Sequence, residues 1–211
     1  MVEAHTDLDG DTKFVIEGNE FDYGFSIGVF VGGRNCQVRG NLFIVSPPSH
    51  GYIAIWAWLA DTVIIESNRF FACPSTNDNP FGIEIRDCDT AVIRNNSLVN
   101  SYYAILWHET DGLIENNTMI HTDPDWPYSI AVFQGAADNL TIRNNVFVDM
   151  ARPILWGPQA GVGTAALTTF VHNTFWPPRD TLYAMYPAGT DPSRFPLVDS
   201  GNVFAFPMFA D

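Results

Sequence analysis

Basic side chains are scarce in this chain of 211 residues, and lysine is almost absent. Ten basic residues stand against 24 acidic ones, which gives a formal net charge of -14 at pH 7. Only Lys13 is a lysine, and all other basic residues are arginines. Because phosphate binding needs a basic face, this composition excludes a nucleic-acid partner. The strong preference for arginine indicates positions that need a planar guanidinium group.

The chain also lacks long apolar runs and an ordered set of cysteines. No stretch approaches the roughly 18 apolar residues of a membrane-spanning helix, so no membrane span is expected. The N-terminal sequence Met-Val-Glu-Ala-His has neither the basic nor the apolar region of a signal peptide, so the compartment is unknown. Cys36, Cys73 and Cys88 have no metal-binding or redox spacing. We therefore expect reduced or buried thiols and a fold that does not depend on disulfides.

One short pattern recurs along almost the whole chain. It consists of an apolar residue, two variable residues, an asparagine, any residue and a large apolar residue. The asparagines are Asn19, Asn41, Asn68, Asn96, Asn117, Asn145, Asn173 and Asn202. An asparagine at a turn tolerates left-handed backbone and can hydrogen-bond to the next coil, so the column predicts a ladder of stacked asparagines. The Phe, Leu or Met two residues later is expected to point inward.

A second apolar segment with a period of two lies between most of these asparagines, at residues 26–30, 52–56, 82–86, 104–108, 130–133 and 154–157. Alternation of this kind predicts strands and not helices. The repeats lack the leucine pattern of leucine-rich repeats and are shorter than the roughly 40 residues of a propeller blade. The sequence therefore predicts an all-β, right-handed parallel β-helix of about seven to eight coils, each with about three strands. We assign residues 1–11 to an N-terminal segment, 12–205 to the β-helix, and 206–211 to a C-terminal cap or tail.

The repeat, with its Asn-Asn turns at 95–96, 116–117 and 144–145, resembles the parallel β-helix repeats of the pectate-lyase-like superfamily. The resemblance implies a polysaccharide lyase, hydrolase or epimerase that binds a polysaccharide or oligosaccharide, in an extracellular or periplasmic setting. The calcium-ligand aspartates, the aspartate-rich hydrolase constellation and the Asp-Pro-His pattern of that superfamily are absent. The alternative is a non-catalytic glycan-binding or structural module, or a fragment of a larger surface protein.

An outward position two residues before each ladder asparagine alternates in charge. Along the stack it reads Glu17, Arg39, Glu66, Arg94, Glu115 and Arg143. Neighbouring coils lie about 5 Å apart, so each arginine can lie between two glutamates. We interpret this column as a structural ion-pair ladder that marks a non-catalytic face.

The second strands carry the candidate site. Aligning them on their first isoleucine places Trp107 and Trp156 in the core, and it sets Phe30, Trp56, Arg86, His108 and Phe133 in one outward column. Aromatic side chains around titratable groups suit a sugar-binding groove. The expected catalytic residues are His108, Arg86, Glu84 and Glu109, and the expected substrate-binding residues are Trp56, Phe30, Phe133 and Asp87. Long insertions at 46–50, 74–80 and 122–128 are expected to wall this groove.

Two further features lie near the ends. Asp7-Leu8-Asp9-Gly10-Asp11 has the carboxylate density of a calcium loop, but it lacks the downstream Glu of an EF-hand. Calcium is therefore the one cofactor that the sequence suggests, and no cofactor is assigned. The apolar segment 204–209 is expected to cap the open end of the stack or to pack on another chain, end to end or edge to edge.

Overall fold

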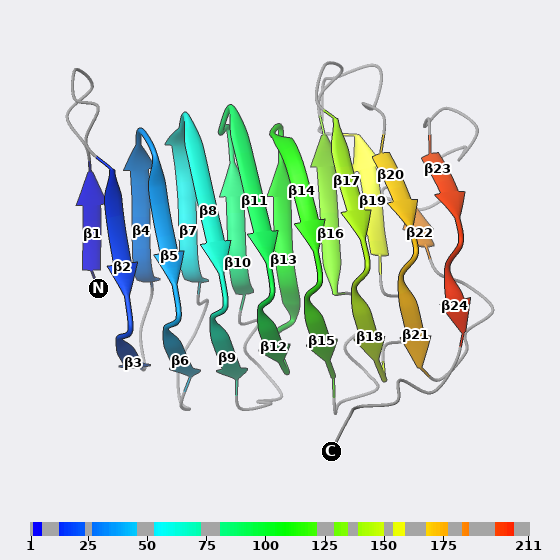
Figure 1. The fold of residues 1–211 in the computed structure, drawn as a ribbon, viewed down its shortest axis with the longest axis horizontal. Coiled ribbons are helices and arrows are strands. Elements are labelled where there is room, and N and C mark those ends of the chain that lie inside the picture. Colours follow the sequence, from blue (N-terminus) through cyan, green and yellow to red (C-terminus); the bar gives the residue numbers. More distant parts are fainter. Residues whose placement is uncertain are drawn as a thin grey trace.

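The computed structural model describes residues 2–5, 13–23, 27–45, 53–72, 81–121, 129–134, 139–149, 154–158, 168–176, 183–185 and 197–204. Every regular element in these ranges is a β-strand, and the strands form three parallel sheets. Figure 1 shows the sheets side on, with the coils following one another from the N-terminus to the C-terminal strands.

Each sheet has eight strands. Sheet A contains β1 (Val2–His5), β4 (Ile27–Gly33), β7 (Ile53–Ala60), β10 (Phe81–Arg86), β13 (Tyr103–His108), β16 (Ile130–Gln134), β19 (Ile154–Pro158) and β22 (Tyr183–Met185). Sheet B contains β2 (Phe14–Glu17), β5 (Cys36–Arg39), β8 (Thr62–Glu66), β11 (Thr90–Arg94), β14 (Asp111–Glu115), β17 (Leu140–Arg143), β20 (Thr168–Val171) and β23 (Leu197–Ser200). Sheet C contains β3 (Glu20–Tyr23), β6 (Leu42–Val45), β9 (Arg69–Ala72), β12 (Ser97–Val99), β15 (Thr118–Ile120), β18 (Val146–Val148), β21 (Thr174–Trp176) and β24 (Val203–Phe204).

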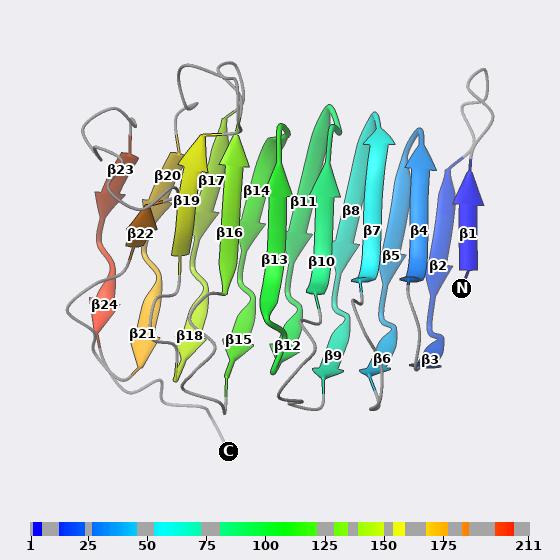
Figure 2. The ribbon, with the colours of Figure 1, turned by 180° about the vertical axis from the view of Figure 1, so that it is seen from behind.

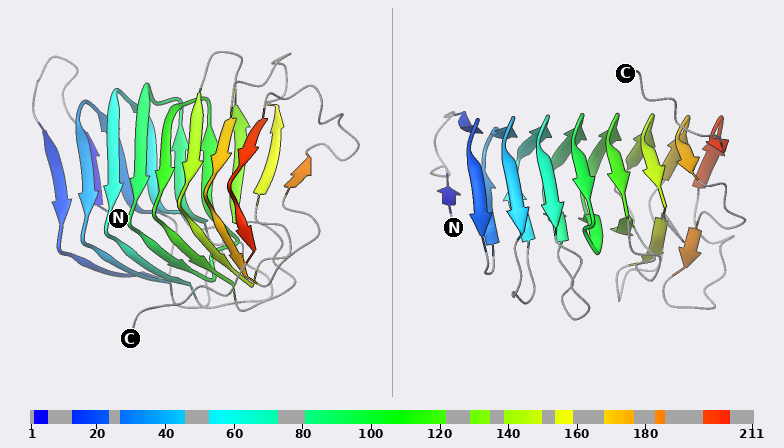
Figure 3. Two further views of the ribbon diagram at one scale, coloured as in Figure 1. Left: turned by 45° about the vertical axis from the view of Figure 1, so that its right-hand side comes forward. Right: turned by 90° about the horizontal axis from the view of Figure 1, so that it is seen from below.

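The chain visits the sheets in a fixed order, and each visit to all three makes one coil. β10 in sheet A leads to β11 in sheet B and β12 in sheet C, and the next coil begins with β13 beside β10. The views in Figure 3 show this winding from the side and from below. The predicted parallel β-helix with three strands per coil is therefore confirmed. Sheet A is the sheet of the second strands, which carry the candidate site.

A ladder of asparagines builds the corner between sheets B and C. Asn96 donates its side-chain amide to the carbonyl oxygen of Ile65 at 2.9 Å and to Oδ1 of Asn117 at 3.0 Å. Its own Oδ1 accepts the backbone N–H of Asn68 at 2.9 Å. The sequence-based expectation of left-handed backbone at the ladder asparagine is wrong by one residue. Positive φ angles occur at the residue before it, at Gly18, Gly40, Ser67, Asn95, Asn116, Asn144, His172 and Gly201.

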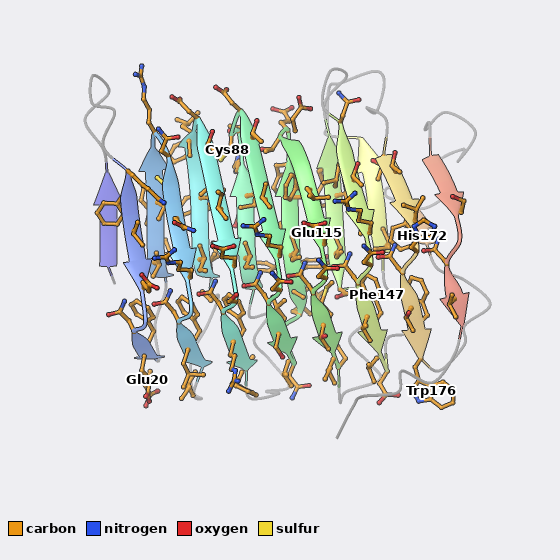
Figure 4. All side chains as sticks on the ribbon, in the orientation of Figure 1. Glu20, Cys88, Glu115, Phe147, His172 and Trp176 are labelled. Carbon is orange, nitrogen blue, oxygen red and sulfur yellow. The ribbon has the colours of Figure 1, made fainter. Side chains whose placement is uncertain are left out.

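Aromatic side chains stack inside the coils beside this corner. The rings of Phe43 and Phe70 lie 4.8 Å apart and nearly parallel, and the rings of Phe147 and Phe175 lie 4.9 Å apart. Leu98 and Met119 continue the column between them and are fully buried. The predicted inward position is therefore confirmed for the described members, and Figure 4 marks Phe147 in this row. Burial of these columns supplies the main stabilisation of the stack.

The alternating charges of sheet B pair as the sequence predicts. The six charged residues of this column, from Glu17 in β2 to Arg143 in β17, are register partners in successive strands. Each of these arginines forms an ion pair with the glutamate of the preceding coil: Arg39 with Glu17 at 2.7 Å, Arg94 with Glu66 at 2.7 Å, and Arg143 with Glu115 at 2.8 Å. The register places Arg39 and Arg94 each between two glutamates, as expected, and their ion pairs go to the glutamate of the preceding coil.

The cysteines of the described chain are free thiols. Cys36 and Cys88 are buried, and burial raises the pKa of the Cys36 thiol to about 11. Cys88 lies at the turn between sheets A and B (Figure 4). Cys73 lies outside the described residues.

Candidate functional site on the outer face of sheet A

The strand register of sheet A differs from the predicted alignment at one place, where β7 is shifted by two residues relative to β10. Arg86 pairs with His108, and His108 pairs with Phe133, as expected. Between β7 and β10, however, Glu84 pairs with Trp56 and Arg86 pairs with Trp58. Trp56 and Phe30 therefore belong to the column of Glu84, and Trp58 takes the place beside Arg86. An error of two keeps each side chain on the predicted face, because the side-chain period of a strand is two. Figure 2 views the molecule from the side of sheet A.

Trp58 belongs to the candidate site, but the alignment of the repeated strands by sequence did not identify it. The register between β4 and β7 shifts between Val31 and Gly33, and Leu59 has a positive φ of 53°. This irregularity gives β7 one extra residue and leaves Trp58 39% exposed on the outer face. Its ring stacks on Trp56 with the centroids 5.7 Å apart and the planes 5° apart. The unusual length of the apolar run from Ile53 to Ala60 was the available signal.

Arg86, Asp87 and Trp58 form a connected group at the end of β10. The indole N–H of Trp58 donates to Oδ2 of Asp87 at 3.2 Å, and Nε of Arg86 lies 3.5 Å from the same oxygen. Asp87 has left-handed backbone, with φ 51°, which ends the strand and turns its carboxylate towards both partners. Arg86 remains exposed. Asp87 thus orients the two groups that face solvent, and its own direct role in binding stays a prediction.

His108 lies beside Arg86 on the next strand and is half-buried. Its ring stacks on Phe133 with the centroids 5.3 Å apart. Burial, together with the positive charge of Arg86, lowers the pKa of His108 to about 4, against a smaller opposing effect of Asp87. The imidazole is therefore neutral at physiological pH and is able to accept a proton.

Glu84 has the opposite shift. It is 7% exposed and lies in the outward column between Trp56 and Leu106. Burial beside these apolar side chains raises the pKa of Glu84, and the nearby charge of Arg86 lowers it by less. Glu84 and His108 are diagonal neighbours on adjacent strands, so their Cα atoms lie about 8 Å apart.

The inward side of β13 fixes the position of His108. Trp107 is fully buried, as predicted, and its indole N–H donates to the carbonyl oxygen of Thr110 at 2.9 Å. The ring lies over Gly112, where an added Cβ would approach it to 2.8 Å. Thr110 Oγ1 donates to the carbonyl oxygen of His108 at 2.7 Å and accepts the backbone N–H of Cys88 at 3.1 Å. With Trp107 held inside, strand alternation holds His108 outside.

The remaining predicted residues surround this centre. Phe30 meets Trp56 edge to face at 5.2 Å between centroids, and both are half-buried. Glu109 follows β13 with a φ of 37°, is half-buried, and donates its backbone N–H to the carbonyl oxygen of Phe133 at 3.2 Å. The structure thus brings Arg86, His108, Phe133 and Asp87 together as expected. It places Glu84 beside them and Phe30 one column away.

Several expectations fall outside the described residues. The insertions at 46–50, 74–80 and 122–128, the segment Asp7–Asp11 and residues 205–209 are among these, and so is the side chain of Trp156. In the described part of the chain, no group of three or more His, Cys, Asp or Glu side chains is placed to hold a metal ion. No described helix is long and apolar enough to span a membrane.

A hollow of about 440 Å³ lies away from His108, at the corner between sheets B and C, and is lined by residues that include Gly18, Gly40 and Arg69.

The outer face of sheet A therefore combines a neutral imidazole, a carboxyl group with a raised pKa, an exposed guanidinium and an exposed indole. This set can take a proton, give a proton, pair with an anion and support an apolar ring face.

Comparison with known proteins agrees with the fold. Neither a curated protein nor a solved structure matches the chain. The family model described as the right handed beta helix region matches residues 6–175, which is most of the chain. The match covers the coils that carry Trp58, Arg86 and His108, and it agrees with the three parallel sheets. The chain belongs to the right-handed β-helix family.

Proposed function

We propose that this chain is a carbohydrate-active enzyme that performs acid–base chemistry on a glycan at the outer face of sheet A. The observation that carries the proposal is the pair His108 and Glu84, whose pKa values move in opposite directions on one face. Neighbouring titratable groups with divergent pKa values are the usual arrangement for a base and an acid in one site.

The chemistry that fits these groups best is proton abstraction next to a sugar carboxylate, followed by elimination. Arg86 pairs with the substrate carboxylate and stabilises the negative charge that develops on it. His108 takes the proton from the carbon next to that carboxylate. The electron pair forms a carbon–carbon double bond as the bond to the glycosidic oxygen breaks, and Glu84 protonates that oxygen. A bound carboxylate also neutralises Arg86, which removes one cause of the low pKa of His108.

Hydrolysis is less well supported, because it ordinarily needs two carboxyl groups that flank the scissile bond. Asp87 is engaged by Arg86 and Trp58. Glu109 lies three residues beyond Leu106, the register partner of Glu84, past the end of β13. The second candidate function is glycan binding without turnover. The observation that favours it is Trp58, whose exposed ring offers a platform for a sugar face and requires no chemistry.

Incubation with a panel of neutral and uronic-acid polysaccharides tests the proposal, with unsaturated products and reducing ends both measured. We expect turnover on a uronic-acid polymer, and a loss of about 10²- to 10⁴-fold in His108→Gln. Arg94→Gln on sheet B is the matched control for Arg86→Gln, and only the latter should lose activity.

Binding without turnover that is lost in Trp58→Ala would favour the second function. Binding that survives Arg86→Ala, His108→Ala and Trp58→Ala, without turnover, would contradict the site on either reading.

A further inference from the structure

The outer face of sheet B has three outward columns that the proposed function does not use. One is the ladder from Glu17 to Arg143. The column beside it reads Val15, Gln37, Ile64, Val92, Leu113, Thr141 and Thr169 in strand register. Val15 is 38% exposed, and Ile64, Val92 and Leu113 are half-buried. A third column contains Thr62, Thr90 and Asp111. Figure 4 shows Glu115 on this face.

The ladder on this face is electrically neutral in a strongly acidic chain. Its three glutamates and three arginines cancel, whereas the whole chain carries a formal charge of -14. Two copies can therefore approach each other through this face, which has a neutral ladder and a central apolar column. The rest of the acidic surface repels a second copy.

The order of the charges is self-complementary. Read from β2 to β17, the ladder alternates from glutamate to arginine, and read backwards it alternates from arginine to glutamate. We propose that this face binds a second copy of the chain with its stack reversed, about a two-fold axis that runs along the strands between β8 and β11. Glu17 then faces Arg143 of the second copy, Arg39 faces Glu115, and Glu66 faces Arg94.

The apolar column fits the same arrangement. Reversal places Ile64 opposite Val92 of the second copy at the centre, and Gln37 opposite Leu113. A hollow of about 390 Å³, lined by Lys13, Asn35, Cys36, Gln37, Thr62 and Ile64, lies on this face. It would receive Leu113 of the second copy, and Asp111 of that copy would lie near Lys13. A second copy stacked in the same direction would instead set glutamate against glutamate and arginine against arginine along the ladder, which is unfavourable.

The size of the face sets the expected strength. A two-fold axis between β8 and β11 overlaps the six strands from β2 to β17 of the two copies. Six strands of four to five residues at about 4.8 Å spacing give a face of about 430 Å² per copy. The total of about 860 Å² is in the range of weak, transient interfaces, so we expect a dissociation constant of about 100 μM.

Sedimentation analysis over a range of concentrations tests this interface. Wild-type protein at about 500 μM should be mostly dimeric. Val92→Lys should shift the dissociation constant at least tenfold, because it places a charge opposite Ile64. Val99→Lys is the matched control: Val99 is also half-buried and outward in the same coil, but it lies on sheet C. Its dimer should persist. A wild-type monomer at about 500 μM, or equal effects of the two variants, would overturn the proposal.

A pair of charge variants tests the reversed order. In a homodimer, Arg94→Glu sets a negative charge opposite Glu66 of the second copy, and Glu66→Arg sets a positive charge opposite Arg94 of the second copy, so each variant alone should be monomeric. Mixed together, the two restore both contacts and should form a heterodimer. Circular dichroism of each variant checks folding. Folded variants that dimerise alone, or that fail to associate on mixing, contradict the two-fold arrangement. This association is independent of glycan turnover, so it stands or falls separately from the proposed function.

Discussion

Glu66 on sheet B and Glu84 on sheet A both have little exposed side chain, yet their pKa values move in opposite directions. Burial alone would raise the pKa of Glu66, but the hydrogen bonds from Arg94 and Gln37 outweigh it and lower the pKa. Glu84 has Trp56 and Leu106 as its register partners, and burial raises its pKa. Sheet B repeats the same arginine–glutamate ion pair along its stack. Sheet A departs from the repeat in the coils of Trp58, Arg86 and His108, and departures from a structural repeat indicate function.

The largest expected effect concerns the repeating part of the molecule. Asn96→Ala removes the side-chain hydrogen bonds to Ile65, Asn68 and Asn117 inside the stack. We expect the free energy of unfolding to fall by about 3–5 kcal/mol, because buried backbone groups lose their partners. Denaturant unfolding measures it.

The adjacent residue is the control for Asn96. Asn95 is exposed and left-handed, with φ 57°. Asn95→Gly should change the stability by less than about 1 kcal/mol, because glycine adopts this backbone freely. Equal losses in the two variants would show that the buried side-chain hydrogen bonds of Asn96 do not stabilise the stack.

The next effect is a pH dependence that comes from sheet A. His108 has a folded-state pKa of about 4, below its ordinary value of 6.5. Between these values the unfolded chain binds a proton that the folded chain does not, so stability falls as pH decreases from about 6.5 to about 4. We expect a loss of about 1–3 kcal/mol from this group, allowing for its partial exposure.

Unfolding curves at several pH values measure this dependence. His108→Gln should flatten the decline, and His172→Gln, at an exposed corner position, should leave it in place. A decline that is unchanged in His108→Gln would assign the pH dependence to other groups.

A smaller effect distinguishes two exposed aromatic residues. If glycans bind on sheet A, Trp58→Ala should weaken binding by about 0.5–1.5 kcal/mol, roughly 2- to 10-fold, with little change in stability. Phe71→Ala removes a 44% exposed ring on sheet C and should not affect binding. Calorimetric titration with an oligosaccharide compares them, and equal affinities of the two variants would remove Trp58 from the site.

The smallest expected effect is on a single ladder pair. Arg143→Gln breaks the 2.8 Å ion pair with Glu115 near the surface, and we expect a loss of about 0.2–1 kcal/mol because such pairs are screened by water. High salt should reduce that difference further. A loss above about 2 kcal/mol would show that the ladder acts as a cooperative network and not as separate pairs.

The repeat made most of the fold predictable. The asparagine positions gave the coil boundaries, and the residues two before and two after them gave the ladder and the inner stack. These positions lie within a few residues of a fixed turn, so no long-range information was needed. The left-handed position was misplaced by one residue. Both residues of the three Asn-Asn turns suit that backbone, but Gly18, Gly40 and Gly201 already pointed to the residue before the asparagine.

The register of sheet A was harder to predict for a physical reason. Ile53 and Ile55 lie on the same face of β7, and alternation cannot tell which of them pairs with Ile83. The structure pairs Ile55 with Ile83 and accommodates the extra residue beside Leu59, which brings Trp58 to Arg86. The sequence also gave no measure of burial on the outer face, so the opposite pKa shifts of Glu84 and His108 could not be predicted.

The most direct test of the sheet A site is the pKa of His108, measured from the imidazole proton shifts in an NMR titration and assigned with His108→Gln. We predict a pKa of about 4 for His108 in the wild type, and a higher value in Arg86→Gln, because that variant removes the positive charge beside the ring. An ordinary pKa near 6.5 in the wild type, unchanged in Arg86→Gln, would contradict it.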